Sequence, residues 1–226
     1  MAGASTAPDG AGTPLAPDDD PTPSVVAKAF GGRAPALPLL AEDGRDVAVD
    51  LRARIGRTGV STYAVAFVSV DGAVDVMWLV DVKTAEQLYL RAAGTKVAID
   101  EGRIARAATA VSRRLRFGRY SPFESTVADL PPNQRIELAT ASLQLAESAD
   151  GLTLTLADAR REPVRRDVVR ARPMGKVADL DCVSEPLPRA AYFDQKRRRV
   201  SIRIEWNAGP DRCDSPPAEH RLWELP

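Results

Sequence analysis

The side chains that most often carry out acid–base, nucleophilic or metal chemistry are scarce in this sequence. It contains one histidine, His220, and two cysteines, Cys182 and Cys213. A zinc site typically needs about three or four His, Cys or carboxylate ligands at short spacing, and no such cluster occurs. A Ser-His-Asp or Cys-His mechanism would have to use His220, which has no nucleophile motif near it. The sequence therefore predicts no catalytic residue, no metal ligand and no cofactor.

Acidic residues accompany three recurring Asp-Gly pairs, which begin at Asp43, Asp71 and Asp150. A calcium loop places acidic ligands at alternate positions before a glycine and closes with a glutamate, and the acids near Asp43 and Asp71 lack that order. No glycine-rich phosphate loop or dinucleotide fingerprint occurs. Because Asp-Gly suits the positive φ angles of tight turns, the pairs at Asp71 and Asp150 indicate turns, whereas the pair at Asp43 only begins a strand; the repeat does not indicate a ligand site.

The two cysteines lie in polar, proline-rich segments that are predicted loops: Cys182 lies just before the final hairpin, and Cys213 lies in the loop that connects its strands. A bridge between Cys182 and Cys213 would close a loop of about 30 residues and stabilise the fold by roughly 3–4 kcal/mol. A merely buried thiol is less common in such segments, so we predict a disulfide and an oxidising compartment. Two free thiols in a cytosolic protein are the alternative.

The strongest charge feature is one face of a helix predicted between residues 100 and 116. Small and apolar residues recur there at helical spacing, and arginines lie opposite them. A solvated outer face is the ordinary interpretation of this pattern. The functional interpretation is a docking surface for an acidic protein or an anionic lipid. The candidate interaction residues are Arg103, Arg106, Arg113 and Arg114.

The overall charge is balanced, with 31 Lys plus Arg and 31 Asp plus Glu among 226 residues. Proteins that bind nucleic acid usually need a basic face that displaces counterions, so we expect no nucleic-acid partner. A hydrophobic content of 44% is enough for a sizeable core. No apolar stretch approaches the ~20 residues of a membrane-spanning helix.

Residues 1–24 form a low-complexity segment of Ala, Gly, Pro, Asp and Thr. The segment has little to bury, so ordering it would cost backbone entropy without return. We predict a disordered tether, followed by a single β-rich domain over residues 25–226. The composition is similar to that of the tails behind the export signals of bacterial surface lipoproteins. We therefore expect an extracytoplasmic location, with the cytoplasm as the alternative.

Alternating apolar and polar residues predict strands on both sides of a helical segment at about 84–117. With Asp71-Gly72 as the central pair of a type I′ turn, Val65 lies opposite Trp78 and Phe67 opposite Val76. Both faces of this hairpin are largely apolar, so we expect it to lie centrally in a sheet. The strands are predicted at 46–55, 61–70, 73–81, 135–147, 152–158, 163–173, 198–206 and 220–226. A hairpin turn or a charge-protected strand edge accounts for the basic run at 196–199.

Residues 39–88 resemble the blade repeat of TolB-like β-propellers. Such blades open with Asp-Gly before an apolar strand, as at Asp43, and close with an apolar strand that ends in Asp, as at Asp81. A propeller needs about four blades of four strands, and this chain offers roughly eight or nine predicted strands interrupted by helices. A complete propeller is therefore not expected. The overall order of elements also resembles that of exported bacterial β-rich proteins of no known activity.

These observations predict an α+β fold with mostly antiparallel sheets, sandwich-like or propeller-fragment-like, and one or two amphipathic helices in the middle. The function that fits is a non-catalytic structural or binding module at the bacterial cell envelope. One alternative is a hydrolase-type enzyme that uses carboxylates in a cleft between sheet and helices. The other is a cytosolic adaptor that docks through the arginine face.

Overall fold

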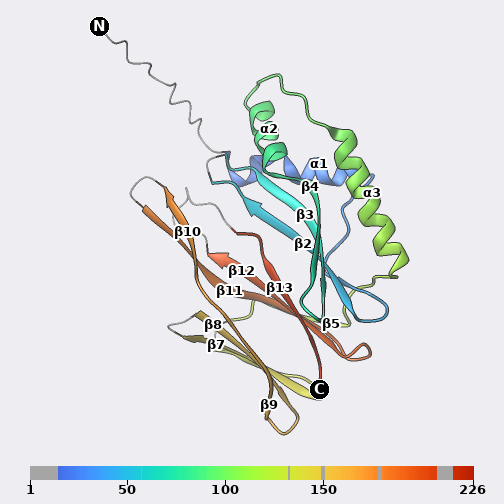
Figure 1. Ribbon diagram of the computed structural model, residues 1–226, viewed down its shortest axis with the longest axis vertical. Helices are drawn as coiled ribbons and strands as arrows, with labels where there is room; N and C mark the ends of the chain where they lie inside the picture. The colour runs from blue at the N-terminus through green and yellow to red at the C-terminus, as the bar shows by residue number, and fades with distance from the viewer. Residues whose placement is uncertain (1–14, 57, 132, 149–150, 178–179, 208–215) are drawn as a thin grey trace.

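A computed structural model describes residues 15–56, 58–131, 133–148, 151–177, 180–207 and 216–226. Within them every strand pair is antiparallel, which confirms the α+β, mostly antiparallel prediction. The strands form three sheets, stacked one after another along the longest axis of the molecule (Figure 1).

The helix-covered sheet comes first in the chain and has the strand order β1-β2-β3-β4. Its strands are β1 (Leu39–Leu40), β2 (Asp46–Arg54), β3 (Ser61–Ser69) and β4 (Val74–Val80). Helices α1 (Thr22–Ala29), α2 (Val82–Ala92) and α3 (Glu101–Phe117) cover one of its faces (Figure 1). The predicted apolar stripe of α3 is buried through Ile104, Ala108 and Val111, because residues three and four apart share one face of a helix.

Caps fix where the two longer helices begin. The Asp81 carboxylate accepts the backbone N–H of Thr84 and so caps α2 at Asp81, three residues before the predicted start of the helical segment at about residue 84. Asp100 caps α3 in the same way through the N–H of Arg103. A carboxylate at a helix N-terminus also meets the positive end of the helix dipole, which stabilises both starts.

Part of the predicted tether is ordered against the helix-covered sheet. The N–H of Leu15 donates to the Thr58 carbonyl at 2.9 Å, and the Asp20 carboxylate accepts the N–H of Ser61 at 3.1 Å. The Thr22 hydroxyl donates to the Ser61 carbonyl at 2.7 Å. These polar contacts order a segment whose composition offers little apolar surface. The first 14 residues lie outside the described part of the chain.

A two-residue turn at Asp71-Gly72 also places Tyr63 opposite Val80, and this pair is observed. From Ala64 to Val68, however, the β3–β4 hairpin differs from the predicted register by one residue. Phe67 pairs with Asp75 and Val65 with Met77, because the connecting loop has three residues rather than two. The Ser69 N–H donates to the Ala73 carbonyl at 2.9 Å, and Gly72 has a φ of +87°. A type I turn followed by a residue in the left-handed region gives this loop length.

The change in register moves the side chains of β4 to the opposite face of the hairpin. Trp78, predicted to pack against Val65, instead pairs with Ala64 and is 41% exposed. The hairpin is also not central, because β4 is the edge strand of its sheet. The Asp-Gly signal identified a hairpin correctly but not its register.

The central sheet contains the longest strand and has the order β10-β11-β12-β13, with β5 also paired to β11. Its strands are β5 (Ser125–Ala128), β10 (Arg172–Val177), β11 (Leu180–Asp194), β12 (Arg199–Asn207) and β13 (Glu219–Glu224). The composition around Pro186 and Pro188 had indicated a loop. These prolines lie where β11 pairs with β12 alone, between its partners β10 and β5, so a missing N–H costs no ladder hydrogen bond there.

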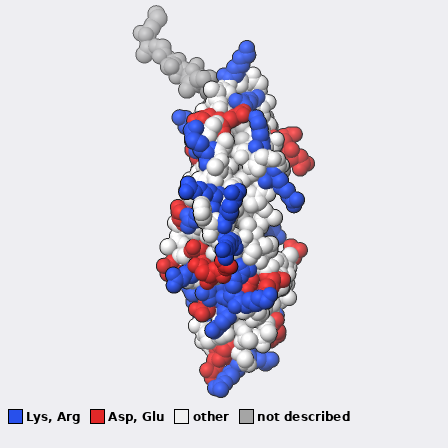
Figure 2. Space-filling model, turned by 90° about the vertical axis from the view of Figure 1, so that its right-hand side faces the viewer, with Lys and Arg blue, Asp and Glu red and all other residues white. Residues whose placement is uncertain are grey.

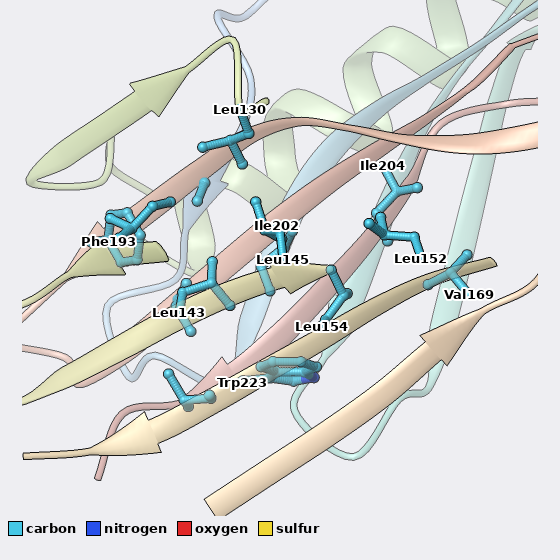
Figure 3. Packing of buried hydrophobic residues seen from close by; sticks show 14 of the residues in the cluster. Leu130, Leu143, Leu145, Leu152, Leu154, Val169, Phe193, Ile202, Ile204 and Trp223 are labelled. Atoms are coloured by element: carbon cyan, nitrogen blue, oxygen red, sulfur yellow. The ribbon is translucent and has the colours of Figure 1, made fainter. Parts of the chain in front are cut away.

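The lower sheet packs on the central sheet and has the order β6-β7-β8-β9. Its strands are β6 (Arg135–Glu137), β7 (Ala141–Ser148), β8 (Gly151–Asp158) and β9 (Pro163–Val169). Inward-facing leucines of β7 and β8 meet Ile202, Ile204 and Trp223 of the central sheet, and all of them are buried (Figure 3). This is the sandwich part of the predicted architecture, with one apolar face from each sheet.

The other face of the central sheet packs against the underside of the helix-covered sheet. Leu222 of β13 joins a buried cluster with Val47, Val49, Ala66 and Val68. The central sheet is therefore covered on both faces, and the molecule has four layers, one of helices and three of sheet (Figure 1).

Arg197, in the β11–β12 hairpin, ties the central sheet to the start of the helix-covered sheet. Its guanidinium donates to the Asp194 carboxylate and to the backbone carbonyls of Leu40 and Pro122. Asp194 is only 1% exposed. Burial by itself raises the pKa of Asp194, but the hydrogen bonds and charge of Arg197 outweigh it and hold that pKa below its usual 3.8. The basic run thus forms a hairpin turn, and one of its arginines is an interior contact.

We predict that Arg197→Met lowers the free energy of unfolding by about 3–5 kcal/mol, because it leaves the buried Asp194 carboxylate without its partner. Arg197→Lys keeps the charge but not the planar set of donors, so it should recover only part of the loss. Lys196→Met is the matched control, since that side chain is 88% exposed and should change stability by no more than about 0.5 kcal/mol. Urea unfolding measures all three; equal effects of Arg197→Met and Lys196→Met would contradict the role of Arg197.

Candidate functional site

The histidine lies beside a serine, but inside the protein. The Ser201 hydroxyl and the Nδ1 atom of His220 are 3.3 Å apart, and both residues are buried between the helix-covered and central sheets. Tyr192 stacks on the imidazole with a ring separation of 6.5 Å. The Nε2 atom of His220 has no hydrogen-bond partner among the described residues.

The electrostatic surroundings of Ser201 and His220 do not suit a serine nucleophile and its general base. Burial, and to a lesser extent the positive charge of Arg203, lower the pKa of His220 from 6.5 to about 3. A general base must gain a proton during the reaction and is normally oriented by a carboxylate on its second nitrogen. Here the nearby charge is a cation, and Ser201 is fully buried, so substrate has no access to the hydroxyl. The arrangement fits a core contact better than catalysis.

The concave feature that brings distant parts of the chain together lies at the outer edge of β13. Its volume is about 340 Å³, and we call it the β13 slot. The β3–β4 hairpin lies on one side of it and β9 on the other. The lining residues are Val68, Ser69, Val70, Gly72, Val74, Arg165, Asp167, His220, Arg221, Leu222 and Trp223.

The slot exists because the three sheets end at different places. The central sheet stops at β13, which lies under β2 and β3. Beyond it, β4 continues the helix-covered sheet by one more strand. Two apolar side chains on the underside of β4 are consequently uncovered, with Val74 57% and Trp78 41% exposed. Exposed apolar residues that adjoin a concave polar site are typical of interaction surfaces.

On the β9 side, the slot is lined by two charged residues, Arg165 and Asp167. Asp167 accepts a hydrogen bond from Arg221 at 2.8 Å, and Arg221 also pairs with Glu219 at 2.9 Å. Arg165 lies over the ring of Trp223, with its guanidinium carbon 5.2 Å from the ring centroid. No described carboxylate lies within ion-pair distance of Arg165. The β9 side of the slot therefore presents one arginine that has no ion-pair partner in the described part of the chain.

The predicted arginine face of α3 does not act as one surface. Arg103 donates to the Thr84 hydroxyl and the Leu79 carbonyl, and Arg114 pairs with Asp75 and lies over the Phe67 ring. Both therefore hold α3 on the sheet. The other two candidates stay outside: Arg106 is 3.9 Å from a carboxylate oxygen of Asp100, and Arg113 lies over the Phe117 ring. Figure 2 shows basic side chains along this face with acidic ones among them, rather than one continuous basic patch.

The cysteines are only partly placed. Cys182 lies on β11 and is buried, and it pairs with Gly175 of β10 instead of lying in the predicted loop. Cys213 lies outside the described residues. The disulfide between them remains a prediction.

Two further pockets among the described residues contain acidic side chains, but no metal-binding cluster. No group of three or more His, Cys, Asp or Glu side chains there could hold a metal ion. The pocket among the helices, of about 540 Å³, contains a single acid, Glu101, whose pKa is lowered by hydrogen bonding to Lys28. A pocket near β7 and β11 has two glutamates, Glu147 and Glu185, and both are exposed. Neither pocket has the buried pair of acids that the hydrolase alternative requires.

No helix among the described residues has the length and apolar character needed to cross a membrane. In comparisons with protein-family models, curated proteins and solved structures, the chain had no significant match. Function therefore has to be argued from the site itself. Nothing in these comparisons bears on the TolB-like resemblance of residues 39–88, although those residues do form four consecutive antiparallel strands and the following helix.

Sequence reasoning missed the slot because its walls come from three separate hairpins. The one available signal was Trp78, a large apolar residue in a strand beside a short polar loop. The predicted register buried Trp78, and the observed register exposes it.

The buried histidine predicts a specific pH dependence of stability. The unfolded chain binds a proton at His220 with a pKa near 6.5, and the folded chain does so only at about 3, so stability is lost as pH falls through this range. Between pH 6.5 and 4.5 the free energy of unfolding should fall by about 2 kcal/mol from this group alone. Urea unfolding of His220→Gln should show a correspondingly smaller decrease over the same interval; identical decreases in variant and wild type would refute the assignment.

Proposed function

We propose that this protein is a non-catalytic binding module of the bacterial cell envelope that holds a segment of a partner protein in the β13 slot. The observation that carries the proposal is the combination of a concave site at a strand edge with two uncovered apolar side chains, Val74 and Trp78. Clefts between layers that join apolar walls to a few polar groups are the usual form of binding sites.

The architecture supports binding better than chemistry. The one histidine in the lining of the slot, His220, is buried and has a pKa of about 3, so it is a weak base at neutral pH. The slot is instead lined by residues from strands and a hairpin of three stacked sheets, which favours a preorganised surface. A preformed site of this kind loses little conformational entropy when a partner binds.

The envelope location rests on the sequence. The low-complexity N-terminal segment and the predicted Cys182–Cys213 bridge both point to an exported protein. The structure adds that Cys182 is at the end of the central sheet where β10 and β11 pair. A covalent link there would restrain the end of the longest strand.

Site-specific photo-crosslinking in the native host tests the proposal. A benzophenone amino acid placed at Val74 should form an adduct with one partner protein, because this side chain opens onto the slot. Val82 on α2 is the matched control, since it is the same residue type and is 54% exposed against 57% for Val74. The adduct should be absent at Val82. Equal adducts at both positions, or none at Val74, would reject the slot as the binding site.

The location has a separate test. If the protein is exported, chain purified from its native host and denatured without reductant should contain no reactive thiol, since its only cysteines are Cys182 and Cys213. Denaturation with reductant should release two thiols. Urea unfolding of the reduced protein should give a free energy of unfolding about 3–4 kcal/mol lower than that of the oxidised protein. Two thiols before reduction would instead indicate a reducing compartment.

A further inference from the structure

We infer that the β13 slot receives its partner by strand addition: an extended segment pairs antiparallel with β13 and presents apolar side chains to β4 and an acidic side chain to Arg165. This inference rests on the proposed function and specifies how the slot binds and what it recognises. Addition of a strand to an open sheet edge is a recurrent mode of peptide recognition, in which backbone hydrogen bonds supply affinity and alternate side chains supply specificity.

The first observation is that the slot exposes a backbone edge. Four consecutive residues, His220 to Trp223, line it. Alternate residues of a strand point to opposite faces, so only the edge can present four in succession. β13 pairs with β12 on its other side and with no further strand among the described residues.

The direction of the free hydrogen-bonding groups follows from the pairing with β12. The Leu225 N–H donates to the Arg198 carbonyl at 2.9 Å, so the odd-numbered residues of β13 direct their N–H and C=O groups toward β12. Those of His220 and Leu222 then point outward, into the slot. No described residue bonds to them. His220 and Leu222 are two positions apart and together present two N–H and two C=O groups, which can form four hydrogen bonds with an incoming antiparallel strand.

The second observation is that the helix-covered sheet on one side and the lower sheet on the other leave a space next to β13, in the plane of the central sheet. Leu222 faces the helix-covered sheet and belongs to its buried cluster, whereas Trp223 faces the lower sheet. In antiparallel pairs, directly opposed residues share a face. Residues of the segment that pair with His220 and Leu222 therefore point toward Val74 and the underside of β4. Those that pair with Arg221 and Trp223 point toward β9.

The third observation is the charge that β9 contributes to the slot. Arg165 and Asp167 point into the slot from β9, and the Asp167 carboxylate is already bound to Arg221. Arg165 is left with the Trp223 ring as its contact. An acidic side chain in the segment would supply the missing partner and convert a cation–π contact into a charge-assisted hydrogen bond. The favoured segment alternates apolar residues with acidic ones.

A displayed library of random dodecapeptides, selected on the full chain, provides the probe. Counter-selection on Val74→Arg removes peptides that bind elsewhere, and this exposed position tolerates substitution without loss of the fold. Enriched peptides should alternate β-branched or aromatic residues with Asp or Glu. Enrichment of peptides without acidic residues would overturn the role given to Arg165.

A synthetic peptide of the enriched sequence then tests the pairing. N-methylation at its apolar positions should weaken binding by more than about tenfold, because those N–H groups face β13, and N-methylation at its acidic positions should change affinity by less than about threefold. Arg165→Ala should weaken binding by about tenfold. Arg166→Ala is the matched control, since Arg166 is exposed and lies on the opposite face of β9; it should leave affinity unchanged.

The outcomes separate this inference from the proposed function. Peptides that bind wild type but not Val74→Arg, and that are insensitive to the site of N-methylation, would overturn strand addition while leaving the slot as a binding site. If no peptide is enriched over the counter-selection, both the inference and the proposed function fail.

Discussion

The guanidinium group of Arg197 lies where the central sheet, the first strand of the helix-covered sheet and the loop before β5 meet. Its donors are distributed over the Asp194 carboxylate, the Leu40 and Pro122 carbonyls and the Ser121 hydroxyl. A lysine could not satisfy so many acceptors in fixed directions. Together with the apolar cluster around Leu222, this residue joins the central sheet to the helix-covered sheet, whose β3–β4 hairpin forms one side of the β13 slot.

A sheet covered on both faces imposes a constraint on composition. One face of the central sheet is almost wholly apolar and packs on the leucines of the lower sheet. The other face combines Leu222 with polar groups, among them Ser201 and His220. Burial there keeps the histidine neutral, which makes the contact compatible with the interior at neutral pH and costly in acid.

Layers of unequal width create the candidate site. β4 extends the helix-covered sheet past the last strand of the central sheet, so Val74 and Trp78 have no layer beneath them. Natural proteins usually protect open strand edges with lysine, proline or a covering segment. The outward edge of β13 instead has apolar residues of β4 on one side and, on the other, Arg165, which has no ion-pair partner among the described residues. Both features favour a bound strand over an aggregation-resistant edge.

Local patterns in the sequence identified several elements well. The alternation in β12 and the helical periodicity of α3 follow from burial of one face, and such burial is visible in any sufficiently long regular pattern. β11 was missed because Pro186 and Pro188 are ordinary loop signals. They fit a strand only where a neighbouring strand is absent, and that is a property of the assembled sheet.

The sequence by itself determined the fold class, the balanced charge, the hairpins and the scarcity of catalytic side chains. Tertiary structure decided the register of β4, the interior role of Arg197 and the division of the α3 arginines between structural contacts and solvent. The physical reason is that side-chain periodicity reports burial of a face but not what covers it. A one-residue difference in loop length moved Trp78 from a predicted core to an exposed position on β4, the strand whose Val74 lines the slot, and only the packing of three sheets shows that slot.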